Sequence, residues 1–102
     1  MRQVTNGKVY DTDKAELLHR YESEEDGLYG IEEGLYVTAK GAYFIAGSGG
    51  AGTIYAARES STNSSGGSGI QVLDRDAAIE WLERHGGTEA LLEHFADALE
   101  EA

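Results

Sequence analysis

The chain has 102 residues, with 19 acidic and 8 basic side chains, a formal net charge of −11 and no cysteine. These counts exclude disulfides and thiolate metal sites, and no apolar run approaches the ~18 residues of a membrane span. So negative a charge argues against direct binding of nucleic acid, which needs lysine and arginine to displace counterions, and it suits a basic partner.

The first elements expected along the chain are a hairpin and a helix. Asn6-Gly7 accepts the positive φ angles of a type I′ turn, and β-branched residues flank it between Val4 and Val9. Asp11 or Thr12 then offers an N-cap oxygen, which predicts a helix to about Tyr21.

Short strands are expected in the middle of the chain. Residues 35–38 and 42–45 flank the loop Ala39-Lys40-Gly41, whose final glycine is typical of a type I turn with a G1 bulge. Residues 28–31 offer another antiparallel strand, and residues 70–73 a last one. Between them, residues 53–59 fit a helix or a strand equally, and the serine- and glycine-rich residues 60–69 predict a flexible loop.

Two helices are predicted near the C-terminus. Asp74 N-caps the first, which runs through His85 and stops at Gly86-Gly87, and Thr88 caps a second to about Glu100. Their apolar stripes predict burial of Trp81, Leu82, Leu92, Phe95 and Leu99, with the acids facing outward. His85, at a helix C-terminus, is expected to act as a cationic cap rather than as a metal ligand.

We therefore expect one α+β domain over residues 1–102. A small antiparallel sheet of four or five strands, the N-terminal hairpin plus a meander, should pack against one N-terminal and two C-terminal helices. The segment Met1 to Val4 has no apolar signal-peptide region, so a cytoplasmic location is expected. We expect no cofactor, no metal and no catalytic residue.

The sequence of residues 47–52, GSGGAG, matches G-x-G-x-x-G, and Asp74 stands where a dinucleotide fold places its ribose-binding acid. Backbone N–H groups there could hold a phosphate. The preceding strand, however, belongs to an antiparallel hairpin, and too few strands remain for a doubly wound sheet. The alternative is a turn in which the backbone passes close to another element.

The acids fall in two blocks, residues 22–33 with net charge −6 and residues 74–102 with net charge −7. Like charges three and four residues apart destabilise a helix, so one-sign stripes on both helices suggest a binding surface. Solubility or salt adaptation is the alternative explanation. The candidate partner-binding residues are Glu24, Glu25, Asp26, Asp76, Glu80, Glu83, Glu89, Glu93 and Asp97.

Several short motifs together resemble a loose family of small acidic proteins encoded in bacterial genomes, phages and other mobile elements. The matching residues are Gly7-Lys8, Tyr10-Asp11-Thr12, Ala15-Glu16, Leu35-Tyr36, Thr38, Gly41, Tyr43-Phe44, Gly47, Gly49-Gly50, Tyr55-Ala56 and Trp81-Leu82-Glu83. The family brings no assigned activity. The resemblance implies a context in which small acidic proteins act on host defence machinery, anti-CRISPR inhibitors among them.

The expected function is that of a non-enzymatic interaction protein. Its acidic surface would inhibit or modulate a basic, nucleic-acid-handling protein, with fast association that weakens in salt. The alternatives are a small-ligand or phosphate-binding module built on residues 47–52, and a scaffold or assembly protein whose acidity serves solubility only.

Overall fold

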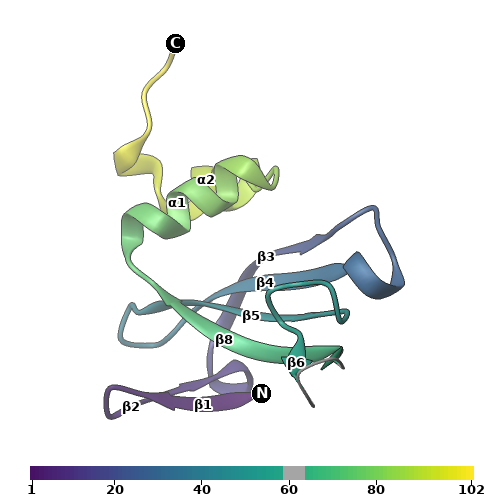
Figure 1. Cartoon of the computed structure of the whole chain (residues 1–102). Helices are drawn as coiled ribbons and strands as arrows, with labels where there is room; N and C mark the ends of the chain where they lie inside the picture. Colours follow the sequence, from purple (N-terminus) through teal and green to yellow (C-terminus); the bar gives the residue numbers. More distant parts are fainter. Residues whose placement is uncertain (59–63) are drawn as a thin grey trace.

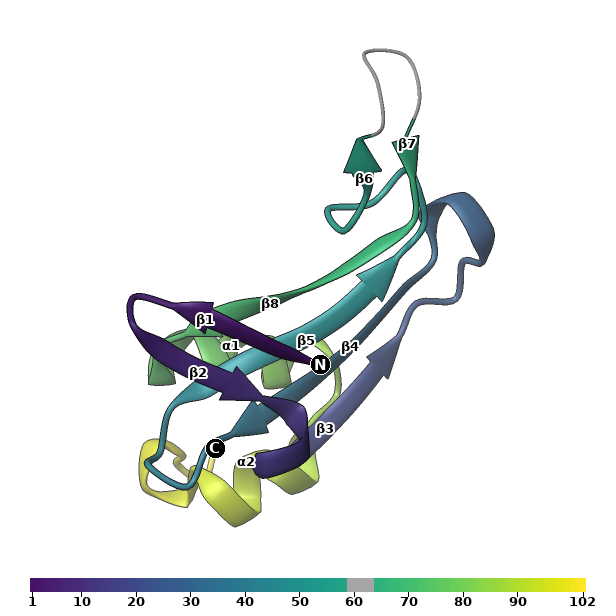
Figure 2. The same ribbon diagram turned by 90° about the horizontal axis from the view of Figure 1, so that it is seen from below.

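The computed structural model describes residues 1–58 and 64–102 and shows an α+β fold in three layers (Figure 1). Its elements are β1 (Arg2–Thr5), β2 (Lys8–Asp11), β3 (Glu16–Glu22), β4 (Ile31–Val37), β5 (Tyr43–Gly49), β6 (Ala57–Arg58), β7 (Ser64–Ser65), β8 (Gly67–Leu73), α1 (Arg75–Arg84) and α2 (Thr88–His94). A four-stranded antiparallel sheet of order β3-β4-β5-β8 forms the middle layer. The helices cover one face of this sheet, and the β1–β2 hairpin crosses the other (Figure 2).

The N-terminal hairpin is confirmed. Asn6 and Gly7 have φ angles of 51° and 75°, the positive values that a type I′ turn requires at both central positions. The side chain of Gln3 in β1 donates to the carbonyl oxygen of Ile70 and accepts from its N–H, at 3.3 and 3.4 Å. These two bonds occupy backbone groups on the outer edge of β8, which would otherwise be open to pairing with another strand.

The helix predicted from Asp11 or Thr12 to Tyr21 is wrong. Asp11 does cap, since its side chain accepts from the N–H of Asp13 at 3.0 Å, but only a 3₁₀ turn of three residues follows. The chain then enters β3, which pairs with β4 and carries a bulge between Leu17 and His19. Pairing with β4 overrides the helical preference of this segment, because propensity is a weak term beside a full ladder of hydrogen bonds.

The β4–β5 hairpin is confirmed and is longer than predicted. The N–H of Gly41, at φ 86°, bonds to the oxygen of Thr38 at 2.9 Å, and Thr38 bonds back to Ala42 at 2.8 Å, as in a type I turn with a G1 bulge. The strand expected at residues 28–31 is mostly absent. Residues 27–29 form a 3₁₀ turn, and only Ile31 belongs to a strand.

The serine- and glycine-rich region is also more regular than predicted. Residues 64–65 pair with 57–58 as β7 and β6, and residues 67–69 begin β8, which continues to the predicted strand 70–73. Residues 60–63 of the expected loop, and residue 59 of the segment left open between helix and strand, lie outside the described residues. Residues 53–56 form neither a helix nor a strand, and the N–H of Ala56 bonds to the oxygen of Thr53 at 3.1 Å.

The start of α1 and the turn between the helices are confirmed. The Asp74 carboxylate accepts from the N–H of Ala77 at 2.8 Å, and Gly86, at φ 71°, allows the N–H of Gly87 to reach the oxygen of Leu82 at 2.8 Å. The second helix differs from the prediction. Its N-cap is Gly87, so Thr88 is its first residue, and it ends at His94 rather than near residue 100.

Each face of the sheet carries its own apolar core. On the helix face, Trp81, Leu82 and Phe95 are buried as predicted. Leu92 is 62% exposed, so its predicted burial is wrong, and its neighbour Leu91, 8% exposed, packs inward instead. A second cluster joins the hairpin to the sheet, with Tyr10, Phe44 and Ile70 at its centre. Among the described residues, α1 and α2 are both C-terminal, so the predicted N-terminal helix is absent, and the hairpin forms a two-stranded sheet of its own instead of joining the main sheet.

Candidate functional site

All nine acids predicted to bind a partner are exposed. Five lie on the two helices, and Asp97 lies in the 3₁₀ turn that follows α2. Glu24, Glu25 and Asp26 lie in the connection between β3 and β4, at one end of the sheet, and both views show this connection apart from the helices. The structure thus groups the helical acids and leaves the loop acids separate.

The two outer layers of the fold differ in net charge. The helix layer, residues 74–102, holds nine acids and two bases. One of those bases, Arg75, is paired with Asp97 at 2.6 Å, and this partner raises the pKa of the guanidinium. The hairpin layer, residues 1–15, holds three bases, Arg2, Lys8 and Lys14, against two acids. The sheet therefore lies between a strongly acidic layer and a slightly basic one.

The glycines of residues 47–52 pack against the protein's own chain. Gly47 and Gly49 lie in β5, and a Cβ at either would overlap the side chain of Tyr55 or Thr53. The N–H groups of Gly50 and Gly52 are taken by the oxygens of Gly30 and Leu28, at 3.1 and 2.8 Å. No helix follows among described residues 50–58, so the dinucleotide-binding loop is not formed. The close-packed turn is the arrangement that the structure contains.

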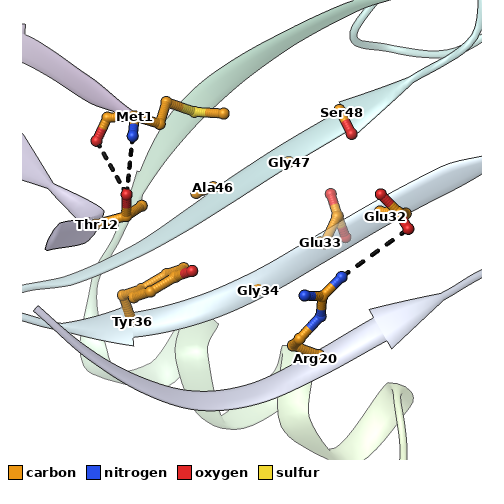
Figure 3. A pocket seen from close by; sticks show the side chains of 10 residues that line it. All are labelled: Met1, Thr12, Arg20, Glu32, Glu33, Gly34, Tyr36, Ala46, Gly47 and Ser48. Atoms are coloured by element: carbon orange, nitrogen blue, oxygen red, sulfur yellow. Dashed lines mark hydrogen bonds and ion pairs between the residues drawn. The ribbon is translucent and has the colours of Figure 1, made fainter.

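A cavity of about 190 Å³ lies on the hairpin face of the sheet (Figure 3). Arg20 of β3 reaches across to Glu32 of β4 at 3.9 Å and also lies 3.6 Å from Glu22. At the other side, the terminal amine of Met1 donates to the hydroxyl of Thr12 at 2.9 Å. Both cationic groups at this small site therefore already have partners within the protein.

A larger cavity, of about 420 Å³, lies on the helix face between α1 and the strands. Its walls combine apolar side chains with the rings of Tyr21, Trp81 and His85, and with the carboxylate of Glu33. Glu80 and Arg84 of α1 also line it. Its volume lies in the range of small-ligand sites, which are mostly apolar with a few placed polar groups.

Glu33 is the centre of a hydrogen-bond network in this cavity. One carboxylate oxygen accepts from the indole N–H of Trp81 at 3.0 Å, and the other accepts from the hydroxyl of Tyr55. Gln71 donates to that hydroxyl at 3.1 Å. Burial and the neighbouring carboxylate raise the pKa of Tyr55 far above its ordinary value, so the phenol stays neutral and donates.

His85 also borders the cavity, but not as the cationic cap that the sequence suggested. Its ring lies 3.9 Å from that of Tyr21 and 4.9 Å from that of Trp81, centroid to centroid. Burial, with a smaller effect of Arg84, lowers the pKa of His85. Its ring is therefore neutral near pH 7. At the C-terminal end of α1, it is the ring of His19 that bonds to the backbone: its Nε2 lies 2.9 Å from the carbonyl oxygen of His85.

Sequence reasoning missed Glu33 because it began the strand at Leu35. Alternation along the observed strand puts Glu33 on the same face as Leu35, which is fully buried in the helix-side core. A carboxylate two residues before a core leucine is the signal that could have found it, since charged side chains seldom point toward a core without partners.

Among residues 1–58 and 64–102 there is no cluster of ligands that could hold a metal ion, and neither helix has the length and hydropathy of a membrane span. Comparison with protein-family models, with curated proteins and with solved structures found no match to the chain.

Proposed function

We propose that the protein is a non-enzymatic interaction protein that binds a basic protein surface through its acidic helix layer. The partner class is a nucleic-acid-handling protein, such as a host defence effector of the kind that anti-CRISPR proteins inhibit. The observation that carries the proposal is the charge difference between the two outer layers of the fold.

That difference supports an oriented encounter. A partner with a basic nucleic-acid-binding surface is attracted to the helix layer and not to the hairpin layer. The electrostatic field of the protein therefore orients its helix layer toward the partner before the two make contact. Glu83, Glu89 and Glu93 are exposed on this layer, and among residues 1–58 and 64–102 the basic side chain within 4 Å of the Glu93 carboxylate is that of His94, at 3.8 Å. A surface that attracts a basic partner needs acidic side chains whose charge is not neutralised by nearby bases. Such like charges lower the stability of the helix only slightly.

The test separates the surface from bulk charge. One variant carries Glu83→Gln, Glu89→Gln and Glu93→Gln. A matched control carries Asp13→Asn, Glu24→Gln and Glu25→Gln, which are exposed acids outside the helix layer, so that both variants lose three negative charges. Wild type and variants are immobilised, basic proteins retained from a lysate are identified, and the Kd of each purified partner is measured at low and high salt.

We expect the helix variant to weaken the Kd about tenfold or more at low salt, since each exposed ion pair contributes up to about 1 kcal/mol. The control should bind as wild type does, and added salt should abolish the difference. Equal losses in the two variants would refute the helix-layer surface, because binding would then follow net charge alone. An unchanged Kd in both variants would support the alternative function, in which the acidity serves solubility only.

A phosphate-binding role for residues 47–52 is not favoured by any of the contacts described above, since two of the glycine N–H groups already have carbonyl partners.

A further inference from the structure

We propose that the cavity between α1 and the sheet binds a small organic cation, a guanidinium group on a short apolar stem, with Glu33 as its anionic partner. The inference does not depend on the proposed function. Glu83, Glu89 and Glu93, which test the acidic surface, are not among the residues that line this cavity.

The charge of Glu33 is the first argument. Its side chain is half-buried, and both hydrogen bonds that it accepts come from neutral donors, the indole of Trp81 and the phenol of Tyr55. No ion pair to Glu33 occurs among residues 1–58 and 64–102. A carboxylate withdrawn from water without a cation is costly, and its usual compensation is an opposite charge.

The geometry of the carboxylate is the second argument. Each of its oxygens holds one donor, and a carboxylate oxygen can accept a second. Two lone pairs therefore remain, one on each oxygen, and a guanidinium fork in a bidentate contact bonds one lone pair of each oxygen. The Trp81 and Tyr55 bonds hold the carboxylate in place for that contact.

The surroundings of the cavity supply the rest. The rings of Tyr21 and Trp81 line it, and aromatic rings attract cations through their negative faces. Glu80 and Arg84, one turn apart on α1, offset one another, and the lowered pKa of His85 keeps that ring uncharged near pH 7. The lining therefore carries one net negative charge. Ile31, Ile45 and Leu73 offer apolar surface for the stem.

The experiment uses the single tryptophan of the chain as a reporter. The indole N–H signal of Trp81 is followed by ¹H–¹⁵N NMR while the full chain is titrated with butylguanidinium, and separately with butylurea, which has the same shape and no charge. We expect a saturable shift with butylguanidinium at millimolar concentrations and none with butylurea. Equal responses to the two compounds, or no saturable response to the cation, would overturn the proposal.

Two variants assign the binding to Glu33. Glu33→Gln replaces one carboxylate oxygen by an NH2 group of similar size and removes the charge, and we expect it to weaken the binding of butylguanidinium about tenfold or more. Glu32→Gln removes the same charge from the opposite face of the same strand and should bind as wild type does. Equal effects of the two variants would refute the site. If Glu33→Gln does not fold, the wild-type comparison with butylurea still decides.

A second arm separates the two sources of such a cation. The capped peptide Gly-Gly-Arg-Gly-Gly is titrated under the same conditions. Binding of both the peptide and butylguanidinium supports the site with the arginine side chain of a partner protein as its occupant, and binding of butylguanidinium alone supports it with a free small molecule. Binding of neither contradicts the proposal.

Discussion

The adjacent leucines of α2 provide a sharp test of how this helix lies on the sheet. Apolar periodicity predicts burial of Leu92, whereas the structure buries Leu91 to 8% exposure and leaves Leu92 62% exposed. Leu91 belongs to the helix-face core with Phe95 and Leu82. Replacing each leucine by alanine in turn therefore removes the same atoms from two very different surroundings.

The expected magnitudes differ severalfold. Leu91→Ala should lower the free energy of unfolding by about 2–5 kcal/mol, the usual cost of removing a core leucine and leaving a cavity. For Leu92, little more than a third of the side chain leaves water on folding, so the loss should stay below about 1 kcal/mol, and the high helix propensity of alanine offsets part of it.

Urea unfolding followed by far-UV circular dichroism measures both values. With a slope of about 1–3 kcal/mol/M, Leu91→Ala should lower the midpoint by about 1 M or more, whereas Leu92→Ala should leave it nearly unchanged. Slopes equal to that of wild type serve as the control for two-state behaviour. If Leu92→Ala cost as much as Leu91→Ala, the face that α2 turns toward the sheet would be the one that periodicity predicts.

Three further predictions concern the local chemistry of the fold, and each is measured by equilibrium unfolding. Gly47→Ala should destabilise the protein by about 1–3 kcal/mol, because a Cβ at this position overlaps the packed phenol ring of Tyr55. Gly69 pairs with Gly47 in the sheet and has open space where a Cβ would stand, so Gly69→Ala should cost much less. Similar costs for the two variants would argue against the close packing at Gly47. Asp74→Ala should cost about 1 kcal/mol through the loss of its N-cap bond, and Thr88→Ala much less, since Thr88 does not cap; the reverse order would restore the cap predicted from sequence. The pKa of His85 is lowered in the folded state, so its contribution to stability is constant above the unfolded pKa of about 6.5 and is lost as the pH falls through the folded pKa. Replacing His85 by asparagine should remove that part of the dependence of the unfolding free energy on pH. An unchanged dependence in the variant would contradict this role of His85.

The features predicted correctly share a short range. The Asn6-Gly7 turn, the glycine at 41, the Asp74 cap and the Gly86 termination each depend on a positive φ or on a hydrogen bond reaching no more than five residues. Such signals are complete within the local sequence, because only neighbouring atoms decide them. The exposure of the five helical acids followed from the same kind of reasoning, since charged side chains on amphipathic helices face water.

The features that were missed depend on distant partners. Residues 16–22 have the composition of a helix but pair with β4. Leu91 lies in the helix-face core with Leu82 and Phe95, whereas Leu92 is exposed. Glu33 acquires its place only when Trp81, 48 residues away, and Tyr55, 22 residues away, donate to it. Local sequence therefore specifies the turns, the caps and the sign of the surface charge, while strand pairing and packing across the sheet decide where the charge lies and which carboxylate faces the cavity. The reason is that ladder hydrogen bonds and burial, the larger energies, arise between segments far apart in the chain.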